Sequence, residues 1–151
     1  MEHDLVVLPD AAALAAEAAS RLADAICTTK AQGRKFNLAV SGGRTPWVML
    51  AELAGRDLPW GAVRIFQVDE RVAPDGDPDR NLTHLRNSLG SVSAEVVPMP
   101  VDRDDLDAAA SDYAESLPQR FDLVHLGLGP DGHTASLVPG DPVLQVEDRP
   151  V

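Results

Sequence analysis

Apolar and polar positions alternate along this chain in a pattern that predicts short strands separated by amphipathic helices. Short apolar runs stand between longer segments in which apolar residues recur at every third or fourth position. The predicted strands cover residues 5–8, 36–40, 63–68 and 121–128, with a weaker candidate at 96–97. The predicted helices cover residues 11–30, 47–53, 81–89 and 104–117. This order is typical of an α/β fold, in which a doubly wound, mostly parallel sheet carries helices on both faces.

Capping residues indicate where several of these helices begin. Asp10 is a favourable N-cap for the first predicted helix, and Thr45 is expected to cap the second. Asn81 is expected to cap the third, although it could instead steady the preceding loop or contact a ligand. A further short helix is expected to open near His133.

Composition limits the classes of function. A chain of 151 residues is expected to form one domain, residues 1–151. The net charge of -11 argues against general binding to nucleic acid or to an anionic membrane, because both need a basic face. The apolar runs are too short to span a membrane, the acidic N-terminus is unlike a signal peptide, and the single Cys27 fits a reducing compartment. We therefore expect a cytoplasmic protein without nucleic-acid or membrane partners, either a monomer or a homodimer.

Three predicted strands end in loops rich in glycine or charge, and in open α/β sheets ligands bind at the carboxyl ends of the strands. The first loop is Ser41–Pro46, with the sequence SGGRTP. Gly42 and Gly43 allow a sharp turn and a close approach to a ligand. The amides at the start of the next helix, with Arg44, form a candidate anion site. A tight turn before a well-capped helix is the alternative explanation.

The second loop begins with Asp69, Glu70 and Arg71, directly after a predicted strand. Adjacent residues of a strand point to opposite faces, so Asp69 and Arg71 are expected on one side and Glu70 on the other. A carboxylate beside a guanidinium could orient a sugar hydroxyl and hold an anionic group. A surface ion pair worth about 0–1 kcal/mol is the alternative.

The third loop contains Gly127-Leu-Gly-Pro-Asp-Gly132, which matches the dinucleotide fingerprint G-x-G-x-x-G. Asp131 argues against that function, because it would place a carboxylate beside the pyrophosphate, and no strand with a ribose-binding acid follows. His133 is the best candidate for a general base, since histidine titrates near neutral pH and Asp131 could fix its tautomer. A loop or helix-capping histidine is the alternative. The sequence has no G-x-S-x-G elbow for a Ser-His-Asp triad, and no second His or Cys at metal-ligand spacing.

Together these loops resemble the 6-phosphogluconolactonases, which share a superfamily with the glucosamine-6-phosphate deaminases/isomerases. The resemblance rests on SGGRTP, on VDERVAP followed by Asn81, and on FDLVHLGLGPDGHTASLVPG. It implies hydrolysis of 6-phospho-D-glucono-1,5-lactone to 6-phosphogluconate in the oxidative pentose phosphate pathway, with no cofactor and no required metal. Deaminases continue the histidine motif into an Asn-Glu-Pro-Gly segment, whereas no acid follows here within residues 134–140. The lactonase is therefore favoured over the deaminase.

Carried onto this chain, the family's catalytic histidine falls on His133 and its acidic–basic loop on Asp69 to Arg71. Its Gly-rich sugar-phosphate loop falls on Ser41 to Thr45, and Asp131 and Gly132 complete the expected substrate site.

This chain departs from the family pattern in four respects. Arg44 stands where the family often has a small hydroxyl residue, Val138 replaces a frequent Phe, and His125 replaces a frequent apolar residue. Family members are also longer, so we expect the N-terminal portion of a longer family fold, truncated at the C-terminus. A non-catalytic sugar-phosphate-binding fragment is a further alternative.

Overall fold

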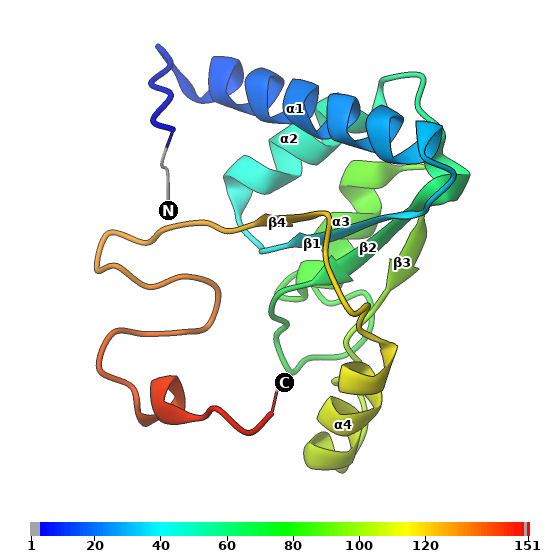
Figure 1. Ribbon diagram of the computed structural model, residues 1–151. Coiled ribbons are helices and arrows are strands. Elements are labelled where there is room, and N and C mark those ends of the chain that lie inside the picture. The colour runs from blue at the N-terminus through cyan, green and yellow to red at the C-terminus, as the bar shows by residue number, and fades with distance from the viewer. Residues whose placement is uncertain (1–3, 150) are drawn as a thin grey trace.

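The computed structural model describes residues 4–149 and residue 151, which form one parallel sheet with helices on both faces (Figure 1). The strands are β1 (Phe36–Val40), β2 (Val63–Gln67), β3 (Glu95–Val97) and β4 (Leu123–His125), in the spatial order β3-β2-β1-β4. The helices are α1 (Ala11–Ala31), α2 (Arg44–Ala54), α3 (Asn81–Leu89) and α4 (Leu106–Ser116), with 3-10 helices at Trp60–Ala62 and Pro142–Gln145. The predicted α/β fold is confirmed. Among the described helices, none has both the length and the apolar character that crossing a bilayer requires.

The two central strands are covered on both faces, which explains their nearly continuous apolar sequences. In both β1 and β2, the residue after the first is half-buried and the others are buried. β1 pairs in parallel with β2 on one side and with β4 on the other, where Val40 lies opposite His125. Parallel pairing brings the carboxyl ends of these strands to one edge of the sheet. The loops that follow β1, β2 and β4 therefore start close together.

Two apolar clusters hold the helices to the sheet. The larger cluster fills the face covered by α1, α2 and α3, where Ile26, Leu50 and Leu85 have no exposed surface. The smaller cluster packs α4 on the other face around Phe66 and Tyr113. The Tyr113 hydroxyl donates to the Gln67 carbonyl over 2.9 Å and accepts from its amide over 3.0 Å. α4 is thereby joined to the end of β2, directly before the second loop.

The capping predictions have different outcomes. The Asp10 carboxylate accepts a hydrogen bond from the Ala13 amide over 2.8 Å, so this N-cap is confirmed. The prediction for Thr45 is wrong, because α2 already begins at Arg44. Gly43 is the N-cap instead, with a φ of +123° that favours glycine. Asn81 is likewise the first residue of α3 rather than its cap.

Two strand predictions need correction. Residues 5–8 form no strand: Leu5 and Val7 are 87% and 81% exposed, and the segment pairs with no described strand. The strand predicted at 121–128 is shorter in the structure, where only β4 forms. Its partner β1 ends at Val40, opposite the last residue of β4. Beyond that point the sheet offers no backbone partner, and the chain leaves it.

The helix expected near His133 does not form. Gly132 and Ala135 on either side of this residue have φ values of +88° and +49°, which a right-handed helix does not accommodate. The chain instead makes a tight bridge between Thr134 and Leu137.

Candidate active site

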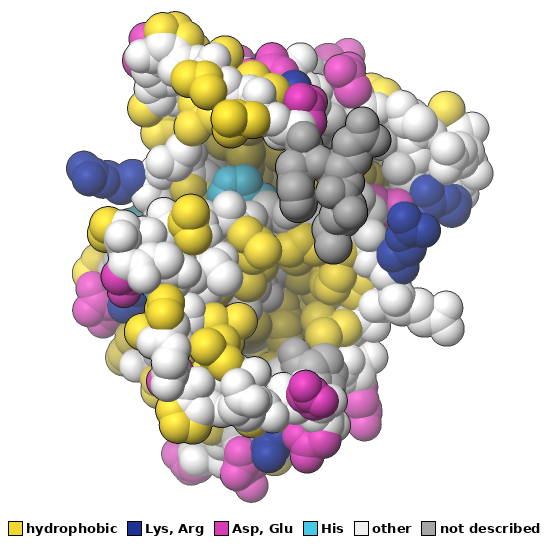
Figure 2. Space-filling view, turned by 60° about the vertical axis from the view of Figure 1, so that its left-hand side comes forward, with side chains coloured by type: hydrophobic (Ala, Val, Ile, Leu, Met, Phe, Trp, Pro, Cys, Tyr) yellow, Lys and Arg dark blue, Asp and Glu magenta, His cyan; other side chains and the backbone are white. Residues whose placement is uncertain are grey.

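The loops after β1, β2 and β4 line one cavity of about 760 Å³, called the loop cavity below. Its lining includes eight of the predicted site residues, namely Ser41, Gly42, Gly43, Arg44, Thr45, Asp69, Arg71 and His133. Asp131 and Gly132 lie in the third loop but do not line the cavity. Figure 2, seen from the side of the third loop, shows a hollow in which apolar side chains gather, with most acidic side chains toward the periphery.

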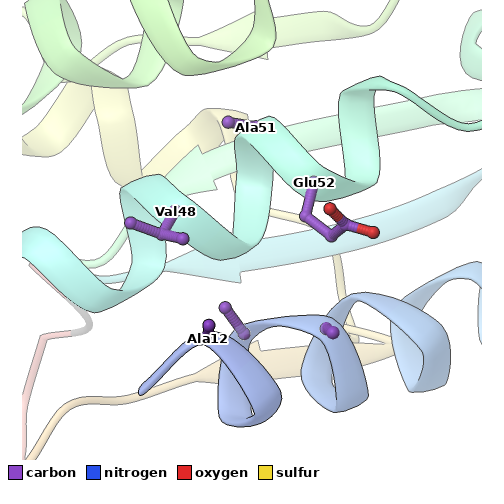
Figure 3. Close-up of a pocket in the computed structure, with 6 residues that line it drawn as sticks. Ala12, Val48, Ala51 and Glu52 are labelled. Atoms are coloured by element: carbon purple, nitrogen blue, oxygen red, sulfur yellow. The ribbon is translucent and has the colours of Figure 1, made fainter. Parts of the chain in front are cut away.

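A second cavity, of about 380 Å³, lies between α1 and α2 (Figure 3). Its lining consists of Ala12, Ala15, Ala16, Val48, Ala51 and Glu52. Because it offers one carboxylate and no cation, it does not suit an anionic ligand. The loop cavity, with two arginines and a histidine, is the candidate site.

The first loop presents amides and a guanidinium to the loop cavity. Gly43 caps α2 without a side-chain hydrogen bond, and Gly43, Arg44 and Thr45 at the start of this helix all line the cavity. Arg44 is exposed, and no described residue forms a hydrogen bond or ion pair with its guanidinium. The arrangement suits an anionic group, since the helix N-terminus and the arginine both carry positive charge.

Ser41 joins the first loop to the third. Its side chain is buried, at 2% exposed, and its hydroxyl accepts a hydrogen bond from the Gly127 amide over 3.1 Å. Its own amide donates to the His125 carbonyl over 3.2 Å. Ser41 therefore sets the relative position of the two loops, in addition to lining the cavity.

The second loop places its residues on the predicted sides. Asp69 and Arg71 line the loop cavity, whereas the Glu70 side chain is turned into the interior. Asp69 Oδ2 accepts from the Ser136 hydroxyl over 2.7 Å, and the backbone carbonyl of Asp69 accepts from Asn81 Nδ2 over 3.1 Å. Asp69 thus connects the second loop to the third loop and to α3.

Hydrogen bonds between residues of the third loop hold His133 in place. Nδ1 of His133 lies 2.5 Å from Asp131 Oδ1, and this hydrogen bond, together with one from the His133 amide, lowers the pKa of the Asp131 carboxyl. The Gly129 amide donates to the His133 carbonyl over 2.8 Å. With Nδ1 bonded to a carboxylate, Nε2 is the nitrogen that remains for substrate or water.

Two glycines leave space for site side chains. A Cβ on Gly129 would lie 2.2 Å from the His133 ring, and a Cβ on Gly42 would lie 2.1 Å from the Asn81 side chain. Gly132 instead contributes a backbone hydrogen bond within the loop, because its amide donates to the Gly129 carbonyl over 3.0 Å. The Gly132 amide is therefore not a free donor for a developing oxyanion.

Comparison with known proteins now identifies the family. The family model described as glucosamine-6-phosphate isomerases/6-phosphogluconolactonase matches residues 9–151. The chain belongs to this family.

Relatives and solved structures agree with this membership. The 6-phosphogluconolactonase of Mesorhizobium japonicum is 40% identical over 137 residues, covering 87% of this chain and 58% of the relative. That of Nostoc sp. is 32% identical, covering 99% of this chain and 68% of the relative. The crystal structure of a 6-phosphogluconolactonase from Shewanella baltica matches with a TM-score of 0.84 and 30% identity over 94% of this chain and 65% of that one. The family fold is shared with a monomeric glucosamine-6-phosphate deaminase, at a TM-score of 0.75 and 19% identity. The chain spans about three fifths of the length of the Mesorhizobium relative.

Within this family member, three contributors to the site lay outside the sequence-based candidates. Glu70 and Arg80 form a buried ion pair beneath the second loop, and Gly129 lies against the imidazole of His133. The alternation of side chains along the strand predicts that Glu70 points away from the cavity. It does not predict that Glu70 pairs with Arg80. No group of three or more His, Cys, Asp or Glu among the described residues is arranged to hold a metal ion.

A second histidine, His125, also lines the loop cavity at the end of β4. Its Nδ1 is buried and has no hydrogen-bond partner among the described residues. Burial lowers the pKa of His125 below its usual value of 6.5. The folded protein therefore holds this imidazole in its neutral form over a wider pH range than the unfolded chain does.

We expect the substitution His125→Leu to stabilise the fold by on the order of 1 kcal/mol at neutral pH, because it removes an unpaired buried polar atom. The stability linked to His125 is fully present above pH 6.5 and is lost as the pH falls from 6.5 toward the lowered folded-state pKa, since the unfolded chain then binds the extra proton. The stabilisation by leucine should therefore grow as the pH falls. Urea unfolding at several pH values measures the difference in free energy of unfolding between His125→Leu and the wild-type chain. A difference that becomes smaller as the pH falls would contradict the lowered pKa of His125.

Proposed function

We propose that this chain carries the active site of a 6-phosphogluconolactonase, which hydrolyses 6-phospho-D-glucono-1,5-lactone to 6-phosphogluconate. The observation that carries the proposal is the shared lining of the loop cavity by His133, Arg71 and the glycine loop before α2. An imidazole can activate water, and the two arginines of the cavity offset the charge of a sugar phosphate. Relatives named 6-phosphogluconolactonase match this chain at up to 40% identity among those compared.

The phosphate of the substrate is assigned to the amides of Gly42 and Gly43, the N-terminus of α2 and the guanidinium of Arg44. The carboxylate of Asp69 orients a sugar hydroxyl through Oδ1, since Oδ2 is engaged by Ser136 and the contact of Oδ1 with Asn81 is long, at 3.4 Å. This placement leaves the lactone carbonyl facing His133 across the cavity.

In the reaction, neutral His133 takes a proton from water while the water oxygen forms a bond to the lactone carbonyl carbon. The carbonyl oxygen becomes the oxyanion of a tetrahedral intermediate, which Arg71 stabilises; one such donor is typically worth about 3–4 kcal/mol. The bond from this carbon to the ring oxygen then breaks, and protonated His133 returns its proton to the ring oxygen. Asp131 holds the imidazole by Nδ1 throughout.

The proposal extends to the setting of the protein. We assign the chain to the cytoplasm, where its exposed Cys27 would stay reduced. We also propose that residues 1–151 form a single sugar-phosphate-binding domain that is part of a longer family fold, with a sugar-phosphate lactone rather than a nucleic acid as its partner.

A direct assay tests the proposed reaction. The chain is mixed with freshly generated 6-phosphogluconolactone, and formation of 6-phosphogluconate is compared with spontaneous opening. Gluconolactone without the phosphate serves as the matched substrate and should react far more slowly, because it lacks the group that the first loop binds. Ammonia release from glucosamine 6-phosphate would instead support a deaminase. Stabilisation of the chain by 6-phosphogluconate without any turnover would support a non-catalytic binding module.

A further inference from the structure

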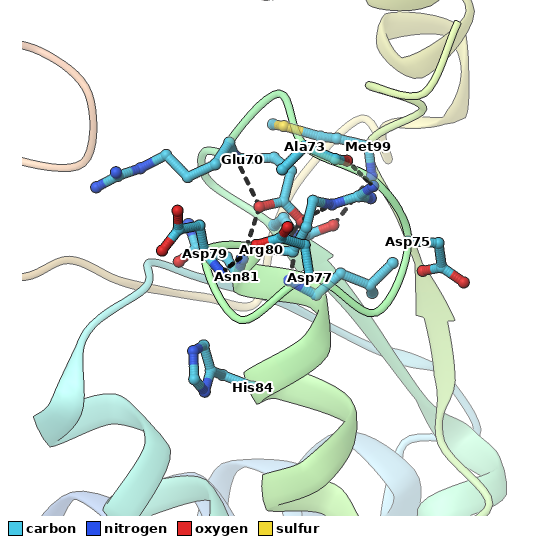
Figure 4. Close-up of polar contacts among 12 residues, drawn as sticks. Glu70, Ala73, Asp75, Asp77, Asp79, Arg80, Asn81, His84 and Met99 are labelled. Carbon is cyan, nitrogen blue, oxygen red and sulfur yellow. Dashed lines mark hydrogen bonds and ion pairs between the residues drawn. The ribbon is translucent and has the colours of Figure 1, made fainter.

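The Glu70 carboxylate lies in the interior of the second loop, close to Arg80 and to Asn81 at the start of α3 (Figure 4). Its side chain is 0% exposed, although its two neighbours in sequence, Asp69 and Arg71, line the cavity. A carboxylate without access to water is costly unless charge and hydrogen bonds compensate for the lost hydration. The contacts of Glu70 therefore indicate what it holds in place.

Both oxygens of this carboxylate are fully engaged. Oε1 accepts from the Arg71 amide over 2.8 Å and from the Asn81 amide over 2.7 Å. Oε2 accepts from Gln67 Nε2 over 2.7 Å and from the Leu82 amide over 2.9 Å. Burial alone would raise the pKa of Glu70, but these hydrogen bonds outweigh it and the pKa is lowered. The group is therefore ionised at neutral pH.

Arg80 supplies the compensating charge. Its side chain is 3% exposed, and its Nε lies 3.2 Å from Glu70 Oε2, in a contact whose alignment is that of an ion pair rather than a hydrogen bond. Its Nη1 donates to the Ala73 carbonyl over 2.9 Å. Arg80 thus closes the loop from residue 70 to residue 80 on itself.

Glu70 also acts as the N-cap of α3 from a distant position in the sequence. The residue that precedes the helix, Arg80, makes no capping hydrogen bond, whereas Glu70 accepts from the first two amides of α3. The first of these belongs to Asn81, whose side chain donates to the Asp69 carbonyl and fills the space beside Gly42. A continuous set of contacts therefore runs from Glu70 to the residues that line the cavity.

We propose that Glu70 is a positioning residue of the active site. Its carboxylate, paired with Arg80, fixes the backbone of Arg71 and Asn81 and so sets where the Arg71 guanidinium and the Asp69 carboxylate stand in the loop cavity. The kinetic part of this inference rests on the proposed function, whereas the geometric part does not. Glu70 itself touches no substrate.

The substitution Glu70→Gln tests the inference, because it keeps the shape but replaces one accepting oxygen with an NH₂ donor that faces amide donors. At a temperature well below unfolding, we expect kcat/KM for the lactone to fall roughly 10- to 10²-fold, because displacement of Arg71 weakens the contact with the oxyanion and lowers kcat, while displacement of Asp69 raises KM. In an Arg71→Ala background the same substitution should have a clearly smaller effect, because the two residues act together. The pH dependence of kcat should stay the same as in the wild-type chain.

Asp122→Asn is the matched control. Asp122 accepts from the Asn37 amide over 2.8 Å and from Arg34 over 3.0 Å, before β4 and outside the lining of the loop cavity. The Asp122→Asn variant should be less stable, with kcat and KM both unchanged. An unchanged kcat/KM in Glu70→Gln, or an equal effect in the Arg71→Ala background, would overturn the proposal.

Amide NMR separates failure of this inference from failure of the proposed function. If the wild-type chain does not turn over the lactone, the lactonase assignment fails, but Glu70→Gln should still shift the backbone resonances of Arg71 and Asn81 and the side-chain amide of Asn81. Unchanged resonances at these positions would overturn the positioning role. If Glu70→Gln does not fold, Arg80→Lys keeps the charge and shortens its reach, and the same resonances and kcat/KM decide the question.

Discussion

Replacement of His133 by alanine is expected to lower the rate of lactone hydrolysis by about 10²- to 10⁴-fold. The imidazole lines the loop cavity, is fixed through Nδ1 by Asp131 and leaves Nε2 for water. The side chain is 41% exposed, so its removal should change the free energy of unfolding by about 0.5 kcal/mol or less. The measurement is kcat with 6-phosphogluconolactone, corrected for spontaneous opening, beside a urea unfolding curve.

His84→Ala is the matched control for this substitution. His84 lies on α3 outside the lining of the loop cavity, where its ring stacks on Trp47 at 5.8 Å and Nε2 contacts the Pro78 carbonyl over 2.7 Å. Its loss should affect stability slightly and kcat hardly at all. An unchanged kcat in His133→Ala would remove this histidine from the mechanism, and an equal loss in both variants would indicate damage to the fold instead.

Much of the fold could be predicted from short-range signals. The run Phe36–Val40 is a strand at the predicted residues, and four of its five residues are apolar, as expected of a strand covered on both faces. The helix at Asn81–Leu89 also has its predicted bounds, and Asp10 caps α1 as expected. The strand and the Asp10 cap depend on residues close together in the sequence, where propensity and capping chemistry decide the outcome, whereas α3 takes its cap from the more distant Glu70.

The errors in the strands occur where distant segments decide the outcome. The length of β4 is set by where β1 ends, and residues 5–8 have an apolar sequence but no strand beside them. Contacts between loops also depend on segments that are far apart in the sequence. The register of the sheet brings Ser41 to Gly127 and Asp69 to Ser136, and none of these pairings leaves a local signature. Sequence alone therefore identified the loops of the site but not the bonds that hold them together.

The G-x-G-x-x-G match correctly marks Gly129 as a point of close approach but suggests the wrong partner for it. Its place in G-x-G-x-x-G resembles a dinucleotide fingerprint, in which glycine allows the backbone to approach a pyrophosphate. In the structure the missing side chain makes room for an imidazole, since a Cβ here would lie 2.2 Å from two atoms of the His133 ring. The motif did mark a close approach, but the partner is a side chain of the same loop.

Gly129→Ala should therefore lower kcat by about 10²-fold, because it forces the His133 ring away from Asp131 and from the cavity. Gly129 has no positive φ, so alanine fits its backbone and the clash with the ring is the main consequence. A partly exposed ring can swing toward solvent, so the free energy of unfolding should fall by only roughly 1 kcal/mol or less. Gly61→Ala is the control, since a Cβ there meets nothing within 4 Å, and it should alter neither quantity.

The double variant Gly129→Ala/His133→Ala gives the sharper test. If the glycine acts only by making room for the imidazole, adding alanine at 129 to His133→Ala should cause no further loss of kcat, because the ring that it displaces is already absent. A further loss as large as in the wild-type background would show that residue 129 acts on the site by another route. A wild-type kcat in Gly129→Ala alone would mean that the ring functions from a different position from the one in this structure.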